Sequence, residues 1–147
     1  MPRIMNTSWL AVIIATLVFF AIGAVWYSAL FEAQWLAAAG MTKAEADAAM
    51  AETGMGKWLF FALLITLAQA IGILMVLNHA GAKRLKACLR VTFWLVVTVV
   101  APLLAYACVY SGYSLTGYLV DLGHLFVGYM ACAAIYSMFR GKDAVDA

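Results

Sequence analysis

The sequence predicts an all-α integral membrane protein: a bundle of four transmembrane helices with one short amphipathic helix in its first outer loop. Hydrophobic residues make up 67% of the chain and charged residues only 11%, whereas soluble domains carry about 25% charged residues. Four apolar segments are each long enough to cross a bilayer, which takes about 20 helical residues. Because lipid offers backbone groups no hydrogen-bonding partners, each of these segments should be helical.

The four predicted spans cover approximately residues 9–31, 58–78, 91–110 and 115–139, within a single membrane domain over residues 1–147. The first span follows Arg3, as a signal peptide would, but it is longer than the 7–15 residues of a signal-peptide apolar region. We therefore interpret it as a retained membrane helix.

The loop between the first two spans is the longest connection and the acidic one. Thr42 and Glu45 have the spacing of a capping box, which predicts a helix over approximately residues 43–53. Gly54 can end this helix. We interpret its acidic residues as a solvated face, with the docking of a partner as the alternative. Their spacing does not match an EF-hand calcium loop.

The third span contains Pro102, which cannot donate a hydrogen bond to the carbonyl of Thr98. We expect a helix kink there, with the Thr98 hydroxyl or a water molecule replacing the lost bond. The connection from Ser111 to Ser114 is so short that the third and fourth spans should be antiparallel neighbours.

The basic residues predict the orientation of the bundle. Seven lie in the two tails and the second connection, two lie in the first connection, and the third connection has none. The positive-inside rule then places both termini in the cytoplasm. The basic residues of the second connection would contact anionic lipid head groups; they are Lys83, Arg84, Lys86 and Arg90.

The fourth span carries the one acidic residue inside any apolar segment, Asp121, with His124 three residues later. An ionisable group in hydrocarbon costs roughly 2.5–3.5 kcal/mol, so the pair should face protein or water rather than lipid. On a helical projection it shares a face with Gly117 and Gly128, where another helix can approach closely. Two interpretations stay open: a polar clasp between helices, or a site for a proton, ligand or cofactor.

The other spans place polar or amphipathic groups at a similar depth, judged from the helical rise of about 1.5 Å per residue. Equal depth does not fix the rotation of each helix, so aromatic-belt and inter-helix hydrogen-bonding roles remain alternatives. The candidate polar pocket comprises Asp121, His124, Gln69, Tyr106, Trp26 and Tyr27.

Several classes of function find no support in the sequence. The net charge of +2 is too small to indicate nucleic-acid binding. Three scattered cysteines fit neither a disulfide framework nor a zinc site. We identify no catalytic residue and no metal site, and a lone membrane histidine such as His124 leaves the question of a haem or pigment cofactor open.

The first span ends in Trp26-Tyr27-Ser28 with Phe31 and Trp35, and the third span contains a proline. The fourth span has its histidine in Asp121-Leu-Gly-His124. In these features, from about Trp9 to Phe139, the sequence resembles a small bacterial membrane family, domain of unknown function 1761, which implies a location in the inner membrane of a bacterium. Glu32 departs from the glycine expected after Phe31. The resemblance implies a four-helix membrane protein and no particular activity.

Three classes of function remain. The first is an accessory or structural subunit of a larger membrane assembly, and the second is an oligomeric carrier or pore for a small solute or protons that uses the Asp121–His124 pair. The third is a membrane enzyme or pigment-binding protein. We favour the first and expect no enzymatic activity. The expected partners are the lipid bilayer and other membrane subunits or a second copy of the chain.

Overall fold

The computed structural model describes residues 3–4 and 7–140, and in these residues the fold is almost entirely helical. Four continuous helical stretches are long and apolar enough to cross a membrane: Trp9–Leu30, Met55–His79, Leu85–Ser111 and Leu115–Arg140. The prediction of an all-α chain with four such helices is confirmed. In chain order the elements are β1 (Arg3–Ile4), β2 (Thr7–Ser8), α1 (Trp9–Val25), η1 (Trp26–Leu30), α2 (Glu32–Ala39), α3 (Lys43–Thr53), α4 (Met55–His79), α5 (Leu85–Leu95), η2 (Val96–Val100), α6 (Ala101–Ser111) and α7 (Leu115–Arg140).

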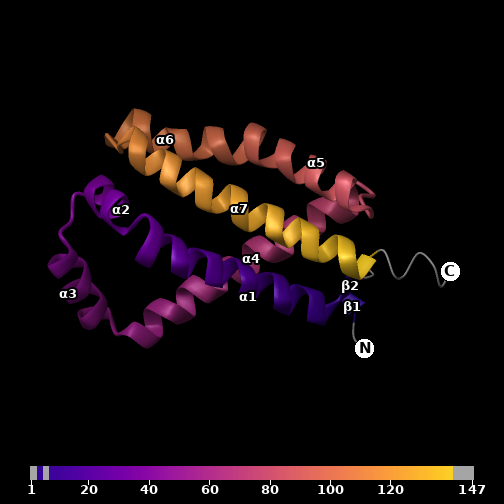
Figure 1. The fold of residues 1–147 in the computed structure, drawn as a ribbon, viewed down its shortest axis with the longest axis horizontal. Coiled ribbons are helices and arrows are strands. Elements are labelled where there is room, and N and C mark those ends of the chain that lie inside the picture. The colour runs from indigo at the N-terminus through magenta and orange to yellow at the C-terminus, as the bar shows by residue number, and fades with distance from the viewer. Residues whose placement is uncertain (1–2, 5–6, 141–147) are drawn as a thin grey trace.

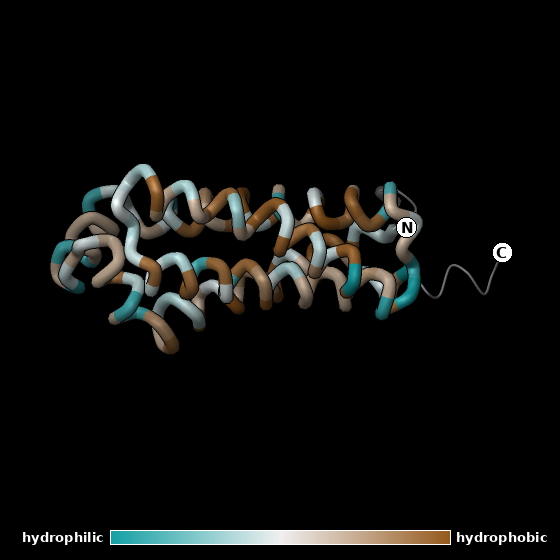
Figure 2. Tube along the Cα trace, turned by 90° about the horizontal axis from the view of Figure 1, so that it is seen from above, coloured by the Kyte–Doolittle hydropathy of each residue, from teal (hydrophilic) through white to brown (hydrophobic). Residues whose placement is uncertain are grey.

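The helix α7 occupies the centre of the bundle (Figure 1). It lies along α1 on one side and along α5, η2 and α6 on the other, while α4 crosses behind α1 and α7. We call the end that holds α2, α3 and residues 112–114 the hairpin end, and the end that holds β1, β2 and the α4–α5 connection the terminal end. Hydrophilic residues gather at these two ends, with mostly hydrophobic residues between them (Figure 2).

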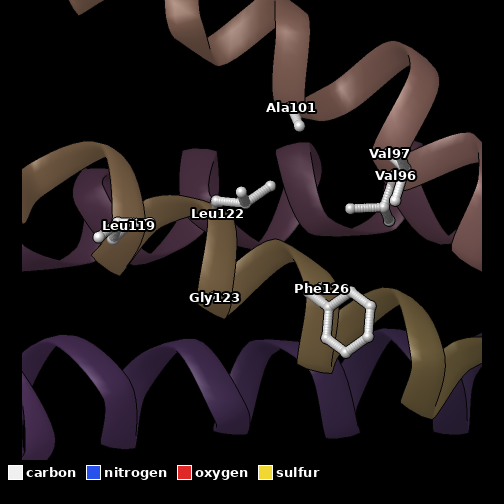
Figure 3. Close-up of a pocket in the computed structure, with 7 residues that line it drawn as sticks. All are labelled: Val96, Val97, Ala101, Leu119, Leu122, Gly123 and Phe126. Carbon is white, nitrogen blue, oxygen red and sulfur yellow. The ribbon is translucent and has the colours of Figure 1, made fainter. Parts of the chain in front are cut away.

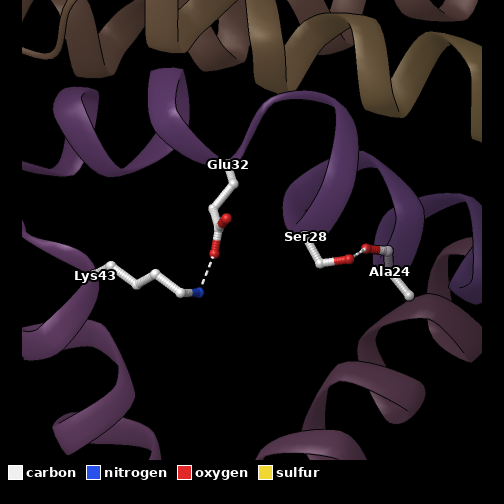
Figure 4. Close-up of polar contacts among 4 residues, drawn as sticks. All are labelled: Ala24, Ser28, Glu32 and Lys43. Carbon is white, nitrogen blue, oxygen red and sulfur yellow. Dashed lines mark hydrogen bonds and ion pairs between the residues drawn. The ribbon is translucent and has the colours of Figure 1, made fainter.

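The first connection contains two helices rather than one. The predicted helix is present as α3, and both halves of its capping box form between Thr42 and Glu45. The second helix, α2, was not predicted; it follows directly on Phe31 and ends at Gly40 in the left-handed conformation (φ 66°). An ion pair between Glu32 of α2 and Lys43 of α3 joins the two helices (Figure 4). The residue that departs from the family pattern, Glu32, thus has a local structural role.

The core lies in the terminal half of the bundle. Phe19 of α1 packs against Gly128 of α7 so closely that a side chain at residue 128 would collide with its ring. The fully buried Tyr136 donates a hydrogen bond from its hydroxyl to the carbonyl of Ala70, at 2.9 Å, and thereby ties α7 to α4. In contrast, the half of α4 near Met55 diverges from the bundle, and its large apolar residues are exposed.

Arg140 is not a free basic residue of the tail. It is the last residue of α7 and only 7% exposed. Its guanidinium donates to the carbonyl of Ala82 at 3.0 Å and to the side-chain oxygen of Asn78 at 2.9 Å. Planar guanidinium groups suit such forked contacts, so Arg140 fastens α7 to the α4–α5 connection at the terminal end.

The distortion near Pro102 takes the form of a π-helical turn, η2. The amide of Ala101 donates to the carbonyl of Val96, five residues back rather than four. The Thr98 hydroxyl donates to the carbonyl of Trp94 at 2.6 Å. The hydroxyl expected to compensate for Pro102 is therefore used one turn earlier, because a threonine side chain in a helix reaches the preceding turn.

Candidate functional site

A second π-helical turn, η1, ends the first membrane-length helix and carries the Trp-Tyr-Ser sequence. The amide of Phe31 donates to the carbonyl of Trp26 at 2.9 Å, which closes the wide turn. The Ser28 hydroxyl donates to the carbonyl of Ala24 at 2.6 Å (Figure 4). Because a π-turn holds an extra residue, both Trp26 and Tyr27 can reach α7 from it.

Trp26 fixes the height of α1 against α7. Its indole nitrogen donates to the carbonyl of Val120 at 3.0 Å. Its ring lies over Gly123, where an added Cβ atom would stand 2.9 Å from the ring carbon Cζ2. The glycine therefore permits the close approach of the indole, and Trp26 has a specific contact rather than a place in an aromatic belt.

Asp121 is held by two tyrosines from different segments. The Tyr27 hydroxyl donates to Oδ1 at 2.8 Å, and the Tyr113 hydroxyl donates to Oδ2 at 2.8 Å. Hydrogen bonds to a carboxylate are roughly twice as strong as those between neutral groups. The cost of placing an acid in this segment is thus offset by neutral donors, one from η1 and one from the connection between α6 and α7.

His124 continues this hydrogen-bonded group inward. Its Nδ1 lies 3.3 Å from the Tyr27 hydroxyl. Because the single Tyr27 proton is donated to Asp121, the hydroxyl oxygen accepts from Nδ1–H, which assigns the proton of a neutral ring to Nδ1. Nε2 is buried without a hydrogen-bond partner among the residues that the structure describes, and it faces Gly23. The His124 ring packs against Phe19, with 5.3 Å between ring centroids.

Tyr113 is the residue of this group that the sequence does not reveal. It lies in the connection at residues 112–114, and its amide donates to the carbonyl of Ala107 at 3.1 Å. The ring covers Gly117 together with Ala38 of α2, both within 2.6 Å of a Cβ atom added to that glycine. Burial, followed by the hydrogen bond and the charge of Asp121, raises the pKa of Tyr113 to about 12. Tyr113 therefore stays a neutral donor to the carboxylate.

The structure brings together four of the six predicted pocket residues: Asp121, His124, Trp26 and Tyr27. Tyr106 does not join them, because it is 61% exposed and stacks on Tyr110. Gln69 is half-buried on α4, and none of the hydrogen bonds described for residues 7–140 joins it to Asp121 or His124. Tyr106 has a suitable depth, but α6 presents it on an exposed face.

A separate apolar groove lies on the other side of α7 (Figure 3). Its volume is about 280 Å³, and it is bounded by η2, the start of α6 and the hairpin half of α7. Gly123 lines this groove on one side and lies against the Trp26 ring on the other, so the backbone of α7 at Gly123 separates the groove from Trp26. The lining residues are all apolar: Val96, Val97, Ala101, Leu119, Leu122, Gly123 and Phe126. The polar group therefore does not open into this groove.

The basic residues of the α4–α5 connection and the start of α5 are exposed at the terminal end. Within residues 3–4 and 7–140, no group of three or more histidine, cysteine or acidic residues is placed to hold a metal ion. The arrangement around Asp121 can hold helices together and can exchange a proton.

Comparison with known proteins supports the family resemblance. No curated protein and no solved structure matches the chain. The sequence model described as "Protein of unknown function (DUF1761)" matches residues 10–137, which include η1, Asp121 and His124. The matched segment covers most of the 147 residues, and the chain belongs to the DUF1761 family.

Proposed function

We propose that this protein is a multi-pass membrane protein that serves as an accessory or structural subunit of a larger membrane assembly. In this proposal Asp121, Tyr27, Tyr113 and His124 form a clasp that holds the hairpin end together. One observation carries the clasp: the two carboxylate oxygens are each bound by a tyrosine hydroxyl from a different segment. The group therefore links η1, α7 and the connection at residues 112–114.

The packing below the clasp supports a structural role over a pore within one chain. Phe19 lies against the His124 ring and also fills the space beside Gly128. Fully buried apolar side chains follow toward the terminal end, among them Val12 and Leu74. A path for ions or polar solutes needs polar or hydrated groups along its length, and these contacts provide none.

Exposed faces near the hairpin end support association with partners. Along α4 from Met55 to Ile65, the large apolar side chains are between 38% and 62% exposed. Tyr106 and Tyr110 form a stacked pair on the exposed face of α6. Helices in membranes associate through packing and hydrogen bonds, and these faces are available for a neighbouring subunit or for lipid.

The basic residues support an orientation with the terminal end in the cytoplasm. Lys83, Arg84, Lys86 and Arg90 lie at or near the α4–α5 connection, whereas α3 at the hairpin end carries three acidic residues. The positive-inside rule favours this orientation, and the same residues would contact anionic head groups. Cysteines introduced singly at residues 46 and 83 in a Cys108→Ser background can test it, because an impermeant thiol reagent added outside intact cells should label only the first.

The subunit role is tested by mild extraction of the tagged full-length chain from its native membrane, followed by sizing and mass analysis. We expect stoichiometric co-purification with other membrane proteins, retained after a second, different detergent. Recovery of the chain alone, or only as a homo-oligomer, in both detergents would contradict the subunit role.

A second candidate function is a proton carrier, and one observation favours it. Tyr113, Asp121, Tyr27 and His124 form a continuous hydrogen-bonded series that runs from the hairpin end toward the middle of the bundle. Purified protein in liposomes loaded with a pH-sensitive dye would then move protons, and Asp121→Asn would abolish this movement. Tyr106→Phe is the matched control, because Tyr106 lies outside the series. Identical dye responses with the wild type and Asp121→Asn would exclude the carrier.

A further inference from the structure

We propose that Asp121 is a proton-binding site whose occupancy is read by Tyr113: protonation of the carboxylate releases Tyr113 and loosens the hairpin end. This inference uses the clasp geometry but needs no partner protein. The proton comes from the water at the hairpin end and bonds to Oδ2, and no other covalent bond changes.

Protonation changes the hydrogen bonds that the Asp121 carboxyl group can form with the two tyrosines. An ionised carboxylate only accepts hydrogen bonds, so it can accept from both tyrosine hydroxyls at once. A protonated carboxyl group is itself a donor through one oxygen. The tyrosine on that oxygen must then turn its own proton away, and a charge-assisted bond is replaced by a weaker neutral one.

The two tyrosines differ in how firmly they are held. The Tyr27 hydroxyl also contacts His124 Nδ1 at 3.3 Å, and its ring packs against Trp35 with 5.8 Å between centroids. The Tyr113 hydroxyl has Asp121 as its one hydrogen-bonding partner within residues 7–140. Because Tyr113 lies in the connection at the end of the bundle, its hydroxyl can donate a hydrogen bond to water once it no longer donates to Asp121. Tyr113 is therefore the group that is released.

Release of Tyr113 has consequences for its neighbours. Its ring lies beside Gly117 of α7, where Ala38 of α2 also packs, so its departure uncovers one side of this contact between α7 and α2. Its backbone amide anchors the connection to Ala107. The sulfur of Cys108 lies 4.0 Å from the carbonyl of Ser114 in the same connection. Opening of the connection should thus expose the Cys108 thiol.

The groups that face Asp121 can be named from each element around it. They are Tyr27 from η1, Tyr113 from the connection, and His124 from α7 itself. The nearest acid in sequence to η1, Glu32, is paired with Lys43 between α2 and α3 (Figure 4). No salt bridge involves Asp121 in the described part of the chain. Protonation of Asp121 thus changes a site without a compensating cation.

The chain contains its own reporter for this release. Cys88 and Cys132 are fully buried, whereas Cys108 is partly exposed beside the connection. The experiment measures the labelling rate of Cys108 by a methanethiosulfonate reagent in the detergent-solubilised full-length protein, with mass analysis to confirm the labelled residue. The rate is compared between wild type and Asp121→Asn at each pH from about 8 to about 4.

The comparison at equal pH removes the pH dependence of the thiol itself. Asparagine offers a single acceptor oxygen and so represents the protonated state. We expect Asp121→Asn to label about tenfold faster than wild type near pH 8, as the loss of a hydrogen bond to a charged group implies, and the two rates to converge as pH falls. A rate ratio that is constant over the whole range would overturn the proposal.

A second variant keeps the test decisive if Asp121→Asn does not fold. Tyr113→Phe removes the responding hydroxyl and leaves Asp121 bonded to Tyr27. Cys108 in this variant should be labelled rapidly at every pH. Its labelling rate, divided by that of a Tyr110→Phe control at the same pH, should rise with pH, because only the control can close. If Cys108 in Tyr113→Phe were labelled at the wild-type rate at every pH, Tyr113 would not respond to the protonation of Asp121. Neither outcome bears on the subunit role, which extraction tests separately.

Discussion

Removal of the Tyr27 hydroxyl should destabilise the bundle by an amount that reports the charge of Asp121. The hydroxyl donates to Oδ1 at 2.8 Å and lies 3.3 Å from His124 Nδ1. A hydrogen bond to a charged group contributes about 1.5–3 kcal/mol, whereas polar pairs between membrane helices average about 0.6 kcal/mol. With Asp121 ionised, we therefore expect Tyr27→Phe to lower the free energy of unfolding by about 1.5–3 kcal/mol.

The assay is reversible unfolding of the full-length protein in mixed micelles, followed by tryptophan fluorescence, at neutral pH. Two matched tyrosine substitutions accompany it. Tyr113→Phe should cost somewhat less than Tyr27→Phe, because its hydroxyl contacts Asp121 alone. Tyr106→Phe should change the free energy of unfolding by less than about 0.5 kcal/mol, since Tyr106 is exposed. If Tyr27→Phe were no more costly than Tyr106→Phe, the reasoning about an ionised, clasped Asp121 would be refuted.

Three further predictions concern packing, the terminal end and pH. Gly128→Ala should cost about 1–3 kcal/mol, because the new methyl group meets a buried phenylalanine ring; Gly72→Ala has open space and should be neutral or stabilising, as unfolding in micelles would show. Arg140→Met should cost about 1–3 kcal/mol because it leaves buried acceptors unpaired; equal effects in the exposed control Arg90→Met would contradict this. Because the pKa of Tyr113 is raised, its contribution to stability is present at neutral pH and is lost as pH rises from about 10 toward about 12. Tyr113→Phe should flatten this alkaline part of the stability profile, and an unchanged profile would refute it.

The sequence was sufficient to predict the four long helices and α3, because the signals for these helices are local. Apolar length alone indicates four long helices, and the Thr42–Glu45 spacing indicates α3. The third membrane-length helix begins at Leu85 rather than at the predicted start near residue 91. The prediction missed its first turns because they carry basic residues, which a search for apolar length excludes. The first connection also holds α2, whose alanine-rich sequence has little apolar periodicity to reveal it.

The candidate site was predicted only in part, because depth along a helix is a local property and rotation is not. The polar face of α7 and the position of η1 brought Asp121, His124, Trp26 and Tyr27 into one prediction, and the structure places them together. Tyr106 lies at the same end but points outward, since rotation depends on the packing of α6.

The role of Tyr113 and the two π-turns could not be predicted from the sequence, for other physical reasons. Tyr113 lies in a short connection, and the tight turn there directs its hydroxyl back onto Asp121. The only sequence signal is a tyrosine in a short loop eight residues before a membrane acid. The π-turns at η1 and η2 depend on hydrogen-bond choices five residues apart, for which no residue pattern is specific.

The most direct test of the central claim is a double-mutant cycle between Tyr27 and Asp121. Unfolding free energies are measured for the wild type, Tyr27→Phe, Asp121→Asn and the double variant, under one set of micelle conditions. The account predicts a coupling energy above about 1 kcal/mol, since the two residues share a hydrogen bond to a charged group. Additive effects, with a coupling energy within about 0.3 kcal/mol of zero, would show that the carboxylate and the tyrosine do not form a clasp between η1 and α7.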